Sequence, residues 1–438
     1  MREMKDSGVE WIDKIPKEWK ITPLKTLFSF GKGLPITKDN LTESGIAVIS
    51  YGQIHAKWNS GVTTHRELFR FVGKEYLDTN ATSLVKKGDF ILADTSEDKD
   101  GCGNCAYIDK DEMIFAGYHT IILRSLCGSE NRYFAYLFLT DSWRSQIRKA
   151  VSGVKLFSIS KRILASCSVI VPDNFQNIVT FLDKKITQID ALIANQQTQI
   201  EKLKAYKQSL ITEVVTKGLD PDVPMKDSGV EWIGMIPNKW RISRIGLHYS
   251  IVLGKMLCPR QTDSTYTLEE YFCAANVHFG EICTDELKEM WFSPTEKRQY
   301  HIETGDMLIV EGGAGAGGCA IVQSSTSALA QNSIMIVRNL RGTDNRYLCY
   351  FIESLVKRGY IDVICNKATI PHFTKEKLSK TQFPVCSQED QILISDYLDK
   401  KCSKIDRLIS LKQAKIEKLE QYKKSLIYEY VTGKREVM

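Results

Sequence analysis

The sequence contains no apolar run long enough to cross a bilayer, although 43% of its 438 residues are hydrophobic. Residues 1–20 are polar and charged, so we expect no signal peptide and a cytoplasmic location. The twelve cysteines are scattered, which is typical of free thiols in a reducing compartment. Cys102 and Cys105 form a C-x-x-C pair, but no second pair of ligands lies nearby, so we predict no metal site.

Patterns that carry catalysis are also missing. The chain has no G-x-x-x-x-G-K-[ST] phosphate loop and no Asp/Asn-Pro-Pro-aromatic tetrapeptide, and its seven histidines show no H-E-x-x-H spacing. Gly313, Gly315 and Gly318 satisfy G-x-G-x-x-G, but the CAIVQSS that follows is a poor start for the helix that a dinucleotide site requires. We therefore predict no catalytic residue and no cofactor on this chain.

The sequence instead repeats itself. MKDSGVEWI begins at positions 4 and 225, each time followed by Ile-Pro and Trp. GDFILAD at 88–94 corresponds to GDMLIVE at 305–311, and NRYFAYLF from position 131 corresponds to NRYLCYFI from position 345. FLDKKITQIDALI and IEKLKAYKQSLI return as YLDKKCSKIDRLI and IEKLEQYKKSLI in the same order. The chain is therefore two copies of one plan, a variable globular part followed by a helix.

Each copy ends in a segment of about 35 residues with the heptad spacing of a coiled coil. The apolar seam positions are Leu182, Ile186, Ile189, Ile193, Ile200, Leu203 and Leu210 in the first copy, and Leu398, Ile405, Ile409, Ile416, Leu419 and Leu426 in the second. Gln196 matches Lys412 and Lys207 matches Lys423 as polar interruptions, which fix register at a cost in stability. We expect the two helices to pair antiparallel about a pseudo-two-fold axis; the alternative is that each packs on its own globular part.

The globular parts read as mixed α/β (α+β). Short β-rich runs such as AVISYG, DFILAD and HTIILRS alternate with loops, and a helical region beginning at NRY precedes a final strand in each copy. Gly218 and two prolines end the first long helix and open a linker. We predict a first globular domain at 1–174, a helix at 175–217, a second globular domain with its linker at 218–389 and a helix at 390–438.

These segments, in this order and twice over, resemble the specificity subunits of type I restriction–modification systems. The resemblance rests on the duplicated MKDSGVEWI…IP…W opening, the GD-[FM]-[IL] strand before a glycine-containing loop, and the LDKK…ID.LI…IEKL..YK.SLI helix, and it covers nearly the whole chain. It implies a non-catalytic subunit of the bacterial or archaeal cytoplasm. Its two variable domains would be target recognition domains that each read one half of a bipartite site in double-stranded DNA.

The resemblance also implies partners. The helices would separate the two domains and dock two methyltransferase (modification) subunits, which would carry S-adenosylmethionine and methylate adenine. Restriction (endonuclease and translocase) subunits would bring ATP and Mg²⁺, and no membrane partner is expected. A two-fold in the protein requires half-sites of opposite orientation, and unlike domains make those half-sites unlike in sequence.

Residues 142–162 are basic and contain no acidic side chain; their cations are Arg144, Arg148, Lys149, Lys155, Lys161 and Arg162. This run is either a solvated face or a phosphate-contacting surface, for which Arg148 and Lys149 are the candidates. Candidates for base contacts come from loops in matching positions: Tyr51, Gln53, His55, Lys155 and Ser158 in the first copy, and Asn276, His278, Lys367, Thr369 and His372 in the second. Each could instead be an ordinary surface residue. Tyr118, His119, Gln331 and Asn332 start matched strands and rank below them.

Two other functions fit parts of the sequence. A coiled-coil scaffold that binds proteins through its globular ends would show the same repeats but no retention of DNA. A fused enzyme and specificity chain would need a catalytic domain, for which the sequence leaves no residues. DNA reading without catalysis is the function that the sequence favours.

Overall fold

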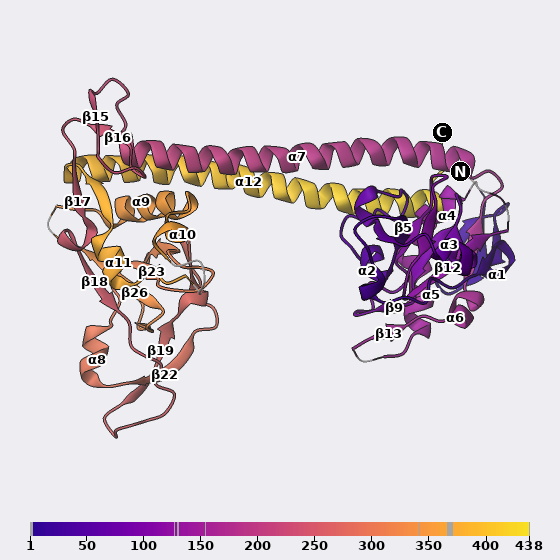
Figure 1. Cartoon of the computed structure of the whole chain (residues 1–438), viewed down its shortest axis with the longest axis horizontal. Coiled ribbons are helices and arrows are strands. Elements are labelled where there is room, and N and C mark those ends of the chain that lie inside the picture. The colour runs from indigo at the N-terminus through magenta and orange to yellow at the C-terminus, as the bar shows by residue number, and fades with distance from the viewer. Residues whose placement is uncertain are drawn as a thin grey trace. The chain divides into compact units, whose positions relative to one another are not determined.

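The computed structural model describes residues 3–126, 128, 131–153, 155–340, 342–365 and 371–437. The chain divides into two compact units (Figure 1). Unit 1 consists of residues 1–196 and 414–438, and unit 2 consists of residues 197–413. Each unit combines one globular part with one portion of each long helix, so unit 1 is assembled from both ends of the chain while unit 2 is one continuous stretch.

The globular part of unit 1 begins with a hairpin and alternates short strands with short helices. Its strands are β1 (Met4–Val9), β2 (Ile12–Pro16), β3 (Lys20–Pro23), β4 (Phe28–Phe30), β5 (Ile46–Ile49), β6 (Arg70–Val72), β7 (Leu84–Val85), β8 (Phe90–Ala93), β9 (Thr95–Ser96), β10 (Cys105–Tyr107), β11 (Ile114–Ala116), β12 (Thr120–Ser125), β13 (Phe157–Ser158) and β14 (Ser168–Val171). Its helices are α1 (Leu24–Leu27), α2 (Tyr51–Ile54), α3 (Tyr76–Thr79), α4 (Arg132–Phe138), α5 (Asp141–Ala150) and α6 (Lys161–Ser166).

The globular part of unit 2 follows the same plan. Its strands are β15 (Met225–Asp227), β16 (Met235–Pro237), β17 (Arg241–Arg244), β18 (Tyr249–Leu253), β19 (Thr267–Phe272), β20 (Val277–His278), β21 (Glu281–Ile282), β22 (Lys288–Phe292), β23 (Met307–Val310), β24 (Cys319–Ile321), β25 (Leu329–Ala330), β26 (Ile334–Asn339) and β27 (Gln382–Val385). Its helices are α8 (Pro294–Gln299), α9 (Asn345–Lys357), α10 (Tyr360–Ile364) and α11 (Lys375–Lys380).

The sheets of the two units correspond strand by strand. The order β10-β8-β12-β4 in unit 1 matches β24-β23-β26-β18 in unit 2, and β6-β5-β11 matches β22-β19-β25. In the second of these sheets, one strand pair in each unit is parallel: β11 with β5 in unit 1 and β25 with β19 in unit 2. The central strands β8 and β23 are buried along their whole length, because their runs FILA and MLIV are apolar on both faces. The predicted internal repeat is thus a repeat of topology as well as of sequence.

The helical region after NRY is split in both copies. In unit 1 the Thr140 side chain accepts a hydrogen bond from the backbone of Trp143, so α5 begins as a new helix after α4. In unit 2 Gly359 takes φ 82° between α9 and α10, a conformation that glycine adopts readily. The apolar spacing predicted one helix in each place, because spacing alone does not show a cap.

The long helices are α7 (Gln176–Lys217) and α12 (Gln388–Val431), and each extends beyond its heptad-spaced segment of about 35 residues. Within each unit a segment of α7 lies beside a segment of α12 (Figure 1). In unit 1 the Lys423 Nζ atom lies 2.6 Å from Asp190 of the facing helix, and in unit 2 the Lys207 Nζ atom lies 2.7 Å from Asp406. These pairs run in opposite directions along the two helices, so the prediction of antiparallel pairing is confirmed. Among the described residues, no helix is both long and apolar enough to span a membrane.

The predicted seam residues lie where the two helices pack. Most are buried, among them Leu182 and Leu398 with no exposed surface, and the polar Gln196 is also buried at 7% exposure. Ile193, Leu203, Ile409 and Leu419 are only partly buried. The seam lysines extend sideways to the facing aspartates, which keeps their charges at the surface.

The repeated NRY segment fastens each globular part to the helices. In unit 1 the Asn131 amide donates to the backbone of the GD turn at Gly88, and Arg132 and Tyr136 both bind Asp183 of the LDKK segment, at 2.8 Å and 2.5 Å. In unit 2 the matching asparagine, arginine and second tyrosine make the corresponding contacts: Asn345 with Gly305, Arg346 with Asp399 and Tyr350 with Asp399. The sequence repeats these segments together because they contact one another.

The duplicated opening also has a structural role. In unit 1 the β1–β2 hairpin and Trp19 belong to the apolar core that contains the end of α12. In unit 2 the β15–β16 hairpin and Trp240 belong to the core that contains the end of α7. Each hairpin therefore covers the carboxyl end of a long helix, and the first hairpin covers the helix of the other copy.

Candidate nucleic-acid interface

The base-contact candidates of the first copy gather where strands β5, β8 and β11 end. Asp94, the residue after β8, donates its backbone N–H to the carbonyl of His119 at 3.1 Å and accepts from the N–H of Ile159 at 2.7 Å. The second bond continues the pairing of β13 with β9, which sets Ser158 opposite Thr95. Three separate loops therefore meet around Asp94.

The side chains around Asp94 are polar and aromatic. His119 Nδ1 lies 3.4 Å from the Asp94 carboxylate, and the Thr95 hydroxyl donates to the same oxygen at 2.7 Å. The ring of Tyr51 packs edge-on against His119 at 5.4 Å and against Tyr118 at 5.7 Å between centroids. His119 has φ 54°, a left-handed conformation that a histidine adopts only where its surroundings hold it. The cluster is half-buried and open to solvent at His119, which is 60% exposed.

Gln53 and His55 serve the local fold. The Gln53 side chain accepts from the backbone N–H of Ser50 at 3.1 Å and so caps α2. The His55 ring contacts the Thr95 carbonyl through Nε2 at 2.9 Å and the Asn104 amide through Nδ1 at 3.1 Å. With both ring nitrogens engaged, His55 positions α2 and the 96–104 loop.

Unit 2 builds the same framework with other side chains. Glu311, the residue after β23, donates its N–H to Ser333 at 2.9 Å and accepts from Phe373 at 2.6 Å. The bridge between Gly312 and His372 replaces the β9–β13 pair, so His372 occupies the position of Ser158. Burial raises the pKa of Glu311 above its usual range, against the opposing effect of His372.

The other candidates of the second copy divide into three groups. Asn276 is buried at 7% exposure and its side chain accepts from the N–H of Cys273 at 3.0 Å, so it holds a turn in place. His278 is exposed on β20. Lys367 and Thr369 lie outside the described residues. Gln331, ranked low, binds the backbone and the hydroxyl of Ser333 beside Glu311 and so supports this loop cluster.

The basic run of residues 142–162 is not one continuous surface. Arg148 is held by Asp141 at 2.9 Å and by the carbonyls of Lys99 and Asp100. Lys149 pairs with Glu10 at 2.5 Å and thereby lowers the pKa of that carboxyl. The three cations nearest to β13 in sequence, Lys155, Lys161 and Arg162, are all exposed. The cations available to an anionic ligand therefore flank Ser158.

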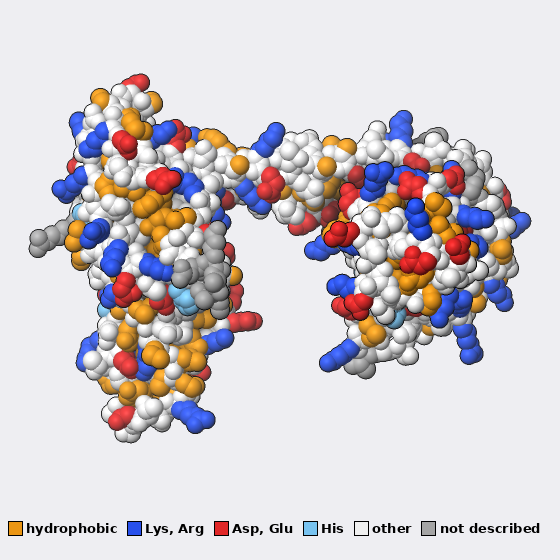
Figure 2. Space-filling view, in the orientation of Figure 1, with side chains coloured by type: hydrophobic (Ala, Val, Ile, Leu, Met, Phe, Trp, Pro, Cys, Tyr) orange, Lys and Arg blue, Asp and Glu red, His pale blue; other side chains and the backbone are white. Residues whose placement is uncertain are grey.

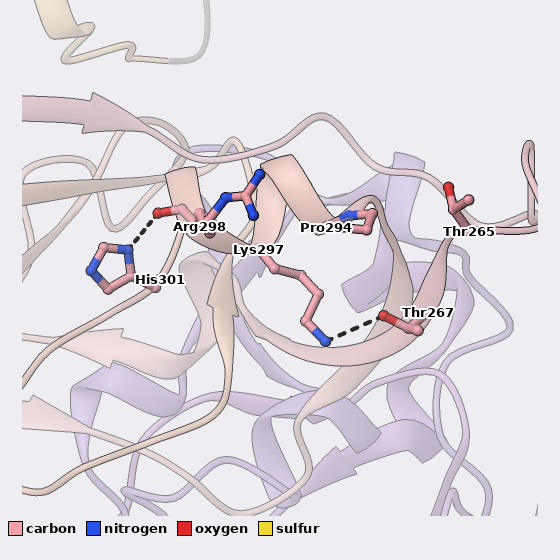
Figure 3. Close-up of a pocket in the computed structure, with 6 residues that line it drawn as sticks. All are labelled: Thr265, Thr267, Pro294, Lys297, Arg298 and His301. Atoms are coloured by element: carbon pink, nitrogen blue, oxygen red, sulfur yellow. Dashed lines mark hydrogen bonds between the residues drawn. The ribbon is translucent and has the colours of Figure 1, made fainter.

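A hollow of about 490 Å³ in unit 2 also contains cations (Figure 3). Lys297, Arg298 and His301 line it together with Thr265, Thr267 and Pro294. The Lys297 ammonium lies 2.5 Å from Glu269 and the His301 ring lies 2.6 Å from Glu303. Since Lys297 and His301 already face carboxylates, the hollow has little net positive charge to offer an anion.

The candidates predicted from the sequence do not include Asp94 and Glu311. Both end the aligned segments GDFILAD and GDMLIVE, so the alignment already held the signal. His119 was ranked low because it begins a strand, yet its left-handed backbone turns it toward Asp94.

The glycine loop and the C-x-x-C pair have structural explanations. Strand β24 follows Gly318, so this loop does not lead into a helix, as predicted. Cys102 and Cys105 are buried free thiols, and burial raises the pKa of Cys105 to about 12, which keeps it protonated at neutral pH.

Comparisons with known proteins agree with this architecture. The putative type I restriction enzyme MjaX specificity subunit of Methanocaldococcus jannaschii is 22% identical over 97% of this chain and 95% of its own length. The MjaVIII specificity subunit of the same organism is 22% identical over 68% of this chain and 69% of its own.

Solved structures share the fold. A chain from work on complex assembly and conformational transition of the type I R-M system superposes with a TM-score of 0.71 at 16% identity, covering 97% of this chain and 100% of that one. The HsdS subunit of Thermoanaerobacter tengcongensis gives a TM-score of 0.51 at 15% identity, over 96% and 98% of the two chains. The family model described as the type I restriction modification DNA specificity domain matches residues 16–202 and 292–421, more than half of the sequence. The chain therefore belongs to the family of type I restriction–modification DNA specificity proteins.

Proposed function

We propose that this chain is the non-catalytic specificity subunit of a type I restriction–modification complex, in which each globular domain reads one half of a bipartite DNA site. The observation that carries the proposal is the matched framework of the two units. Asp94 and Glu311 make corresponding backbone bonds, while the side chains around them differ. One scaffold with two sets of exposed polar side chains is what two unlike half-sites require. We also propose the domain limits 1–174, 175–217, 218–389 and 390–438.

Phosphate contacts would come from the exposed cations beside the strand-end loops. These are Lys155, Lys161 and Arg162, which flank β13 in unit 1. Lys367, the candidate that the sequence predicts in unit 2, lies outside the described residues. Figure 2 shows Lys and Arg side chains interspersed with Asp and Glu over the visible face of each unit. With a net charge of +6, such a surface favours a local set of phosphate contacts over a broad electrostatic attraction.

The helices supply a matched pair of surfaces for two copies of one partner. Leu192 and Tyr206 lie two heptads apart on α7, and Leu408 and Tyr422 lie two heptads apart on α12. Each comes directly before a seam residue, so within each unit the leucine of one helix and the tyrosine of the other flank the same side of the antiparallel pair. Their exposed fractions are 46%, 55%, 47% and 53%.

The register of the helices gives each unit one leucine and one tyrosine. The contact of Lys423 with Asp190 places Leu192 beside Tyr422, and the contact of Lys207 with Asp406 places Tyr206 beside Leu408. We name these the Leu–Tyr patches. Since both units carry one, we propose that two methyltransferase subunits dock there and that restriction subunits join the resulting complex.

DNA binding tests the proposal directly. The chain, purified with its methyltransferase partner, is expected to select two unlike half-sites at a fixed gap, with affinity that falls steeply between 50 and 200 mM salt. A random-sequence selection followed by sequencing of methylated adenines in a host that expresses the complex would report both half-sites. A single continuous site, or binding without sequence preference, would contradict it.

The same complex tests whether the helices set the gap. Inserting one heptad into both α7 and α12 adds about 10 Å of helix, which corresponds to about three base pairs. The half-sites should stay the same while the gap grows. A gap that does not change would refute the spacing role.

A further inference from the structure

Each unit places one carboxylate at the same point of its framework. Asp94 follows β8 and Glu311 follows β23, and both are held by two backbone hydrogen bonds from the same pair of loops. The Asp94 side chain is 31% exposed, and Glu311 is half-buried. A negative charge in a surface that approaches phosphates weakens binding unless the carboxylate accepts a hydrogen bond from the DNA.

The carboxylates at the other end of the same strands provide a contrast. Asp89 and Asp306 are buried, with 3% and 4% of their surface exposed. Asp89 accepts from the backbone of Lys86 and Ser125, and Asp306 binds the Arg338 guanidinium at 2.8 Å. These two acids hold the fold together. Among the described residues, the Asp94 carboxylate contacts the Thr95 hydroxyl and the His119 ring, and the Glu311 carboxylate lies in the electrostatic field of His372.

A carboxylate can only accept hydrogen bonds, which limits what it can read. The donors on base edges in the major groove are the exocyclic amino groups, N4 of cytosine and N6 of adenine. Guanine and thymine present acceptors at the corresponding places, so a carboxylate repels them. An acid at this position therefore selects an amino-bearing base and rejects a keto base.

The histidine beside each carboxylate differs in origin. In unit 1 it is His119, from the turn between β11 and β12. In unit 2 it is His372, from the segment before α11, whose ring lies close to Gly312; a Cβ at that glycine would be 2.7 Å from the ring. Both units thus share the acid, whereas the histidine beside it comes from a different loop in each unit.

We infer that Asp94 and Glu311 are the specificity-determining acceptors that each unit uses to select one cytosine or adenine in its half-site. This inference rests on the proposed DNA-reading function. Each half-site would then contain one amino group that is contacted by an acid, Asp94 in one half-site and Glu311 in the other.

The test compares Asp94→Asn and Glu311→Gln in the complex with the methyltransferase partner. Each variant keeps the shape of the side chain and adds an N–H donor, so it should accept a keto base where the wild type requires an amino base. We expect affinity for the native site to fall about tenfold or more in each variant. Each variant should lose its base preference at one position of one half-site. The affected half-site should differ between the two variants. Glu112→Gln and Glu289→Gln, which remove exposed acids outside the loops around Asp94 and Glu311, should leave every position unchanged.

A second measurement links the acid to the amino group itself. Synthetic sites in which one base at a time lacks its exocyclic amino group are titrated against wild type and variant. Removal of the amino group at one position per half-site should weaken wild-type binding, and the same removal should have little effect on the matching variant. If no position couples in this way, or if both variants keep the full wild-type preference, the inference is wrong.

The outcomes separate the inference from the proposed function. A wild-type complex without a bipartite preference would remove the proposed function itself. A wild type that reads two half-sites, with variants that read them identically, would remove only the inference. If either variant fails to fold, as judged by thermal unfolding, its carboxylate is structural, and this result also contradicts the inference.

Discussion

Tyr133 donates its phenolic hydrogen to the backbone carbonyl of Val431, 298 residues later in the chain, over 2.7 Å. Burial raises the pKa of Tyr133 well above its ordinary value, so the hydroxyl stays protonated and remains a donor. In unit 2 Tyr347 makes the equivalent bond to Val215 at 3.0 Å. Each tyrosine satisfies one of the carbonyls that a helix leaves open at its carboxyl end.

Removal of this hydroxyl should destabilise the unit that contains it. Tyr133→Phe keeps the packing but leaves the Val431 carbonyl buried without its partner, which should cost about 1–2 kcal/mol of unfolding free energy. Urea unfolding of the full chain measures the effect. Tyr206→Phe, at a tyrosine that is 55% exposed, is the control and should change stability little. An equal loss in both variants would show that the bond to the helix end has no special role.

Lys423 and Asp190 should couple across the helix pair. Lys423→Glu places two acids opposite each other and should destabilise unit 1, and Asp190→Lys should restore part of the loss by reversing the pair. A double-mutant cycle should give about 0.5–1 kcal/mol, because the two side chains are 27% and 51% exposed. The coupling should shrink in 1 M salt. Additive single effects would show that the pair does not set the register.

Glu353 should make unit 2 less stable as the pH rises. Burial raises the pKa of this carboxyl above 4.5, although Lys207 and Lys357 oppose the shift. The folded state therefore binds the proton more tightly than the unfolded state. The unfolding free energy falls as the pH rises from the pKa of this carboxyl in the unfolded state to its higher pKa in the folded state. Glu353→Gln removes this titration and should be more stable than wild type at pH 7, with the difference shrinking toward pH 4.5. Urea unfolding at both pH values tests this, and a difference that grows toward acid would contradict it.

The Leu–Tyr patches should each hold one methyltransferase subunit. Leu192→Ser with Tyr422→Ser should lower the number of bound subunits from two to one, because it removes one patch. Leu408→Ser with Tyr206→Ser should do the same, and the four changes together should release both. Light scattering of the purified complex reports its mass. Leu268→Ser, at a leucine of similar exposure on β19, is the control. Full occupancy in all variants would place the docking surface elsewhere.

The repeats predicted the framework because each repeated segment contacts another. Heptad spacing predicted the helices, the pseudo-two-fold relation of the two copies predicted their antiparallel pairing, and the aligned strands predicted two similar globular parts. The spacing could not show that Thr140 and Gly359 interrupt the helices, because caps and left-handed glycines act through local geometry.

The candidate site was harder to predict. Polar residues in loops were identified without knowing which of them the fold itself uses. Gln53, His55 and Asn276 hold caps and turns through their side chains, whereas Asp94 and Glu311 are held mainly through their backbones and keep partly exposed side chains. That difference depends on contacts between loops that are distant in the sequence.

The packing of the first hairpin on the end of α12 has a consequence for synthesis on the ribosome. Unit 1 begins the chain, yet its core stays open until residues 414–431 have emerged. Unit 2 needs nothing beyond residue 413, so the part that is translated later is the first to be complete. Until the end of α12 has been synthesised, the β1–β2 hairpin and Trp19 lack the apolar surface that buries them.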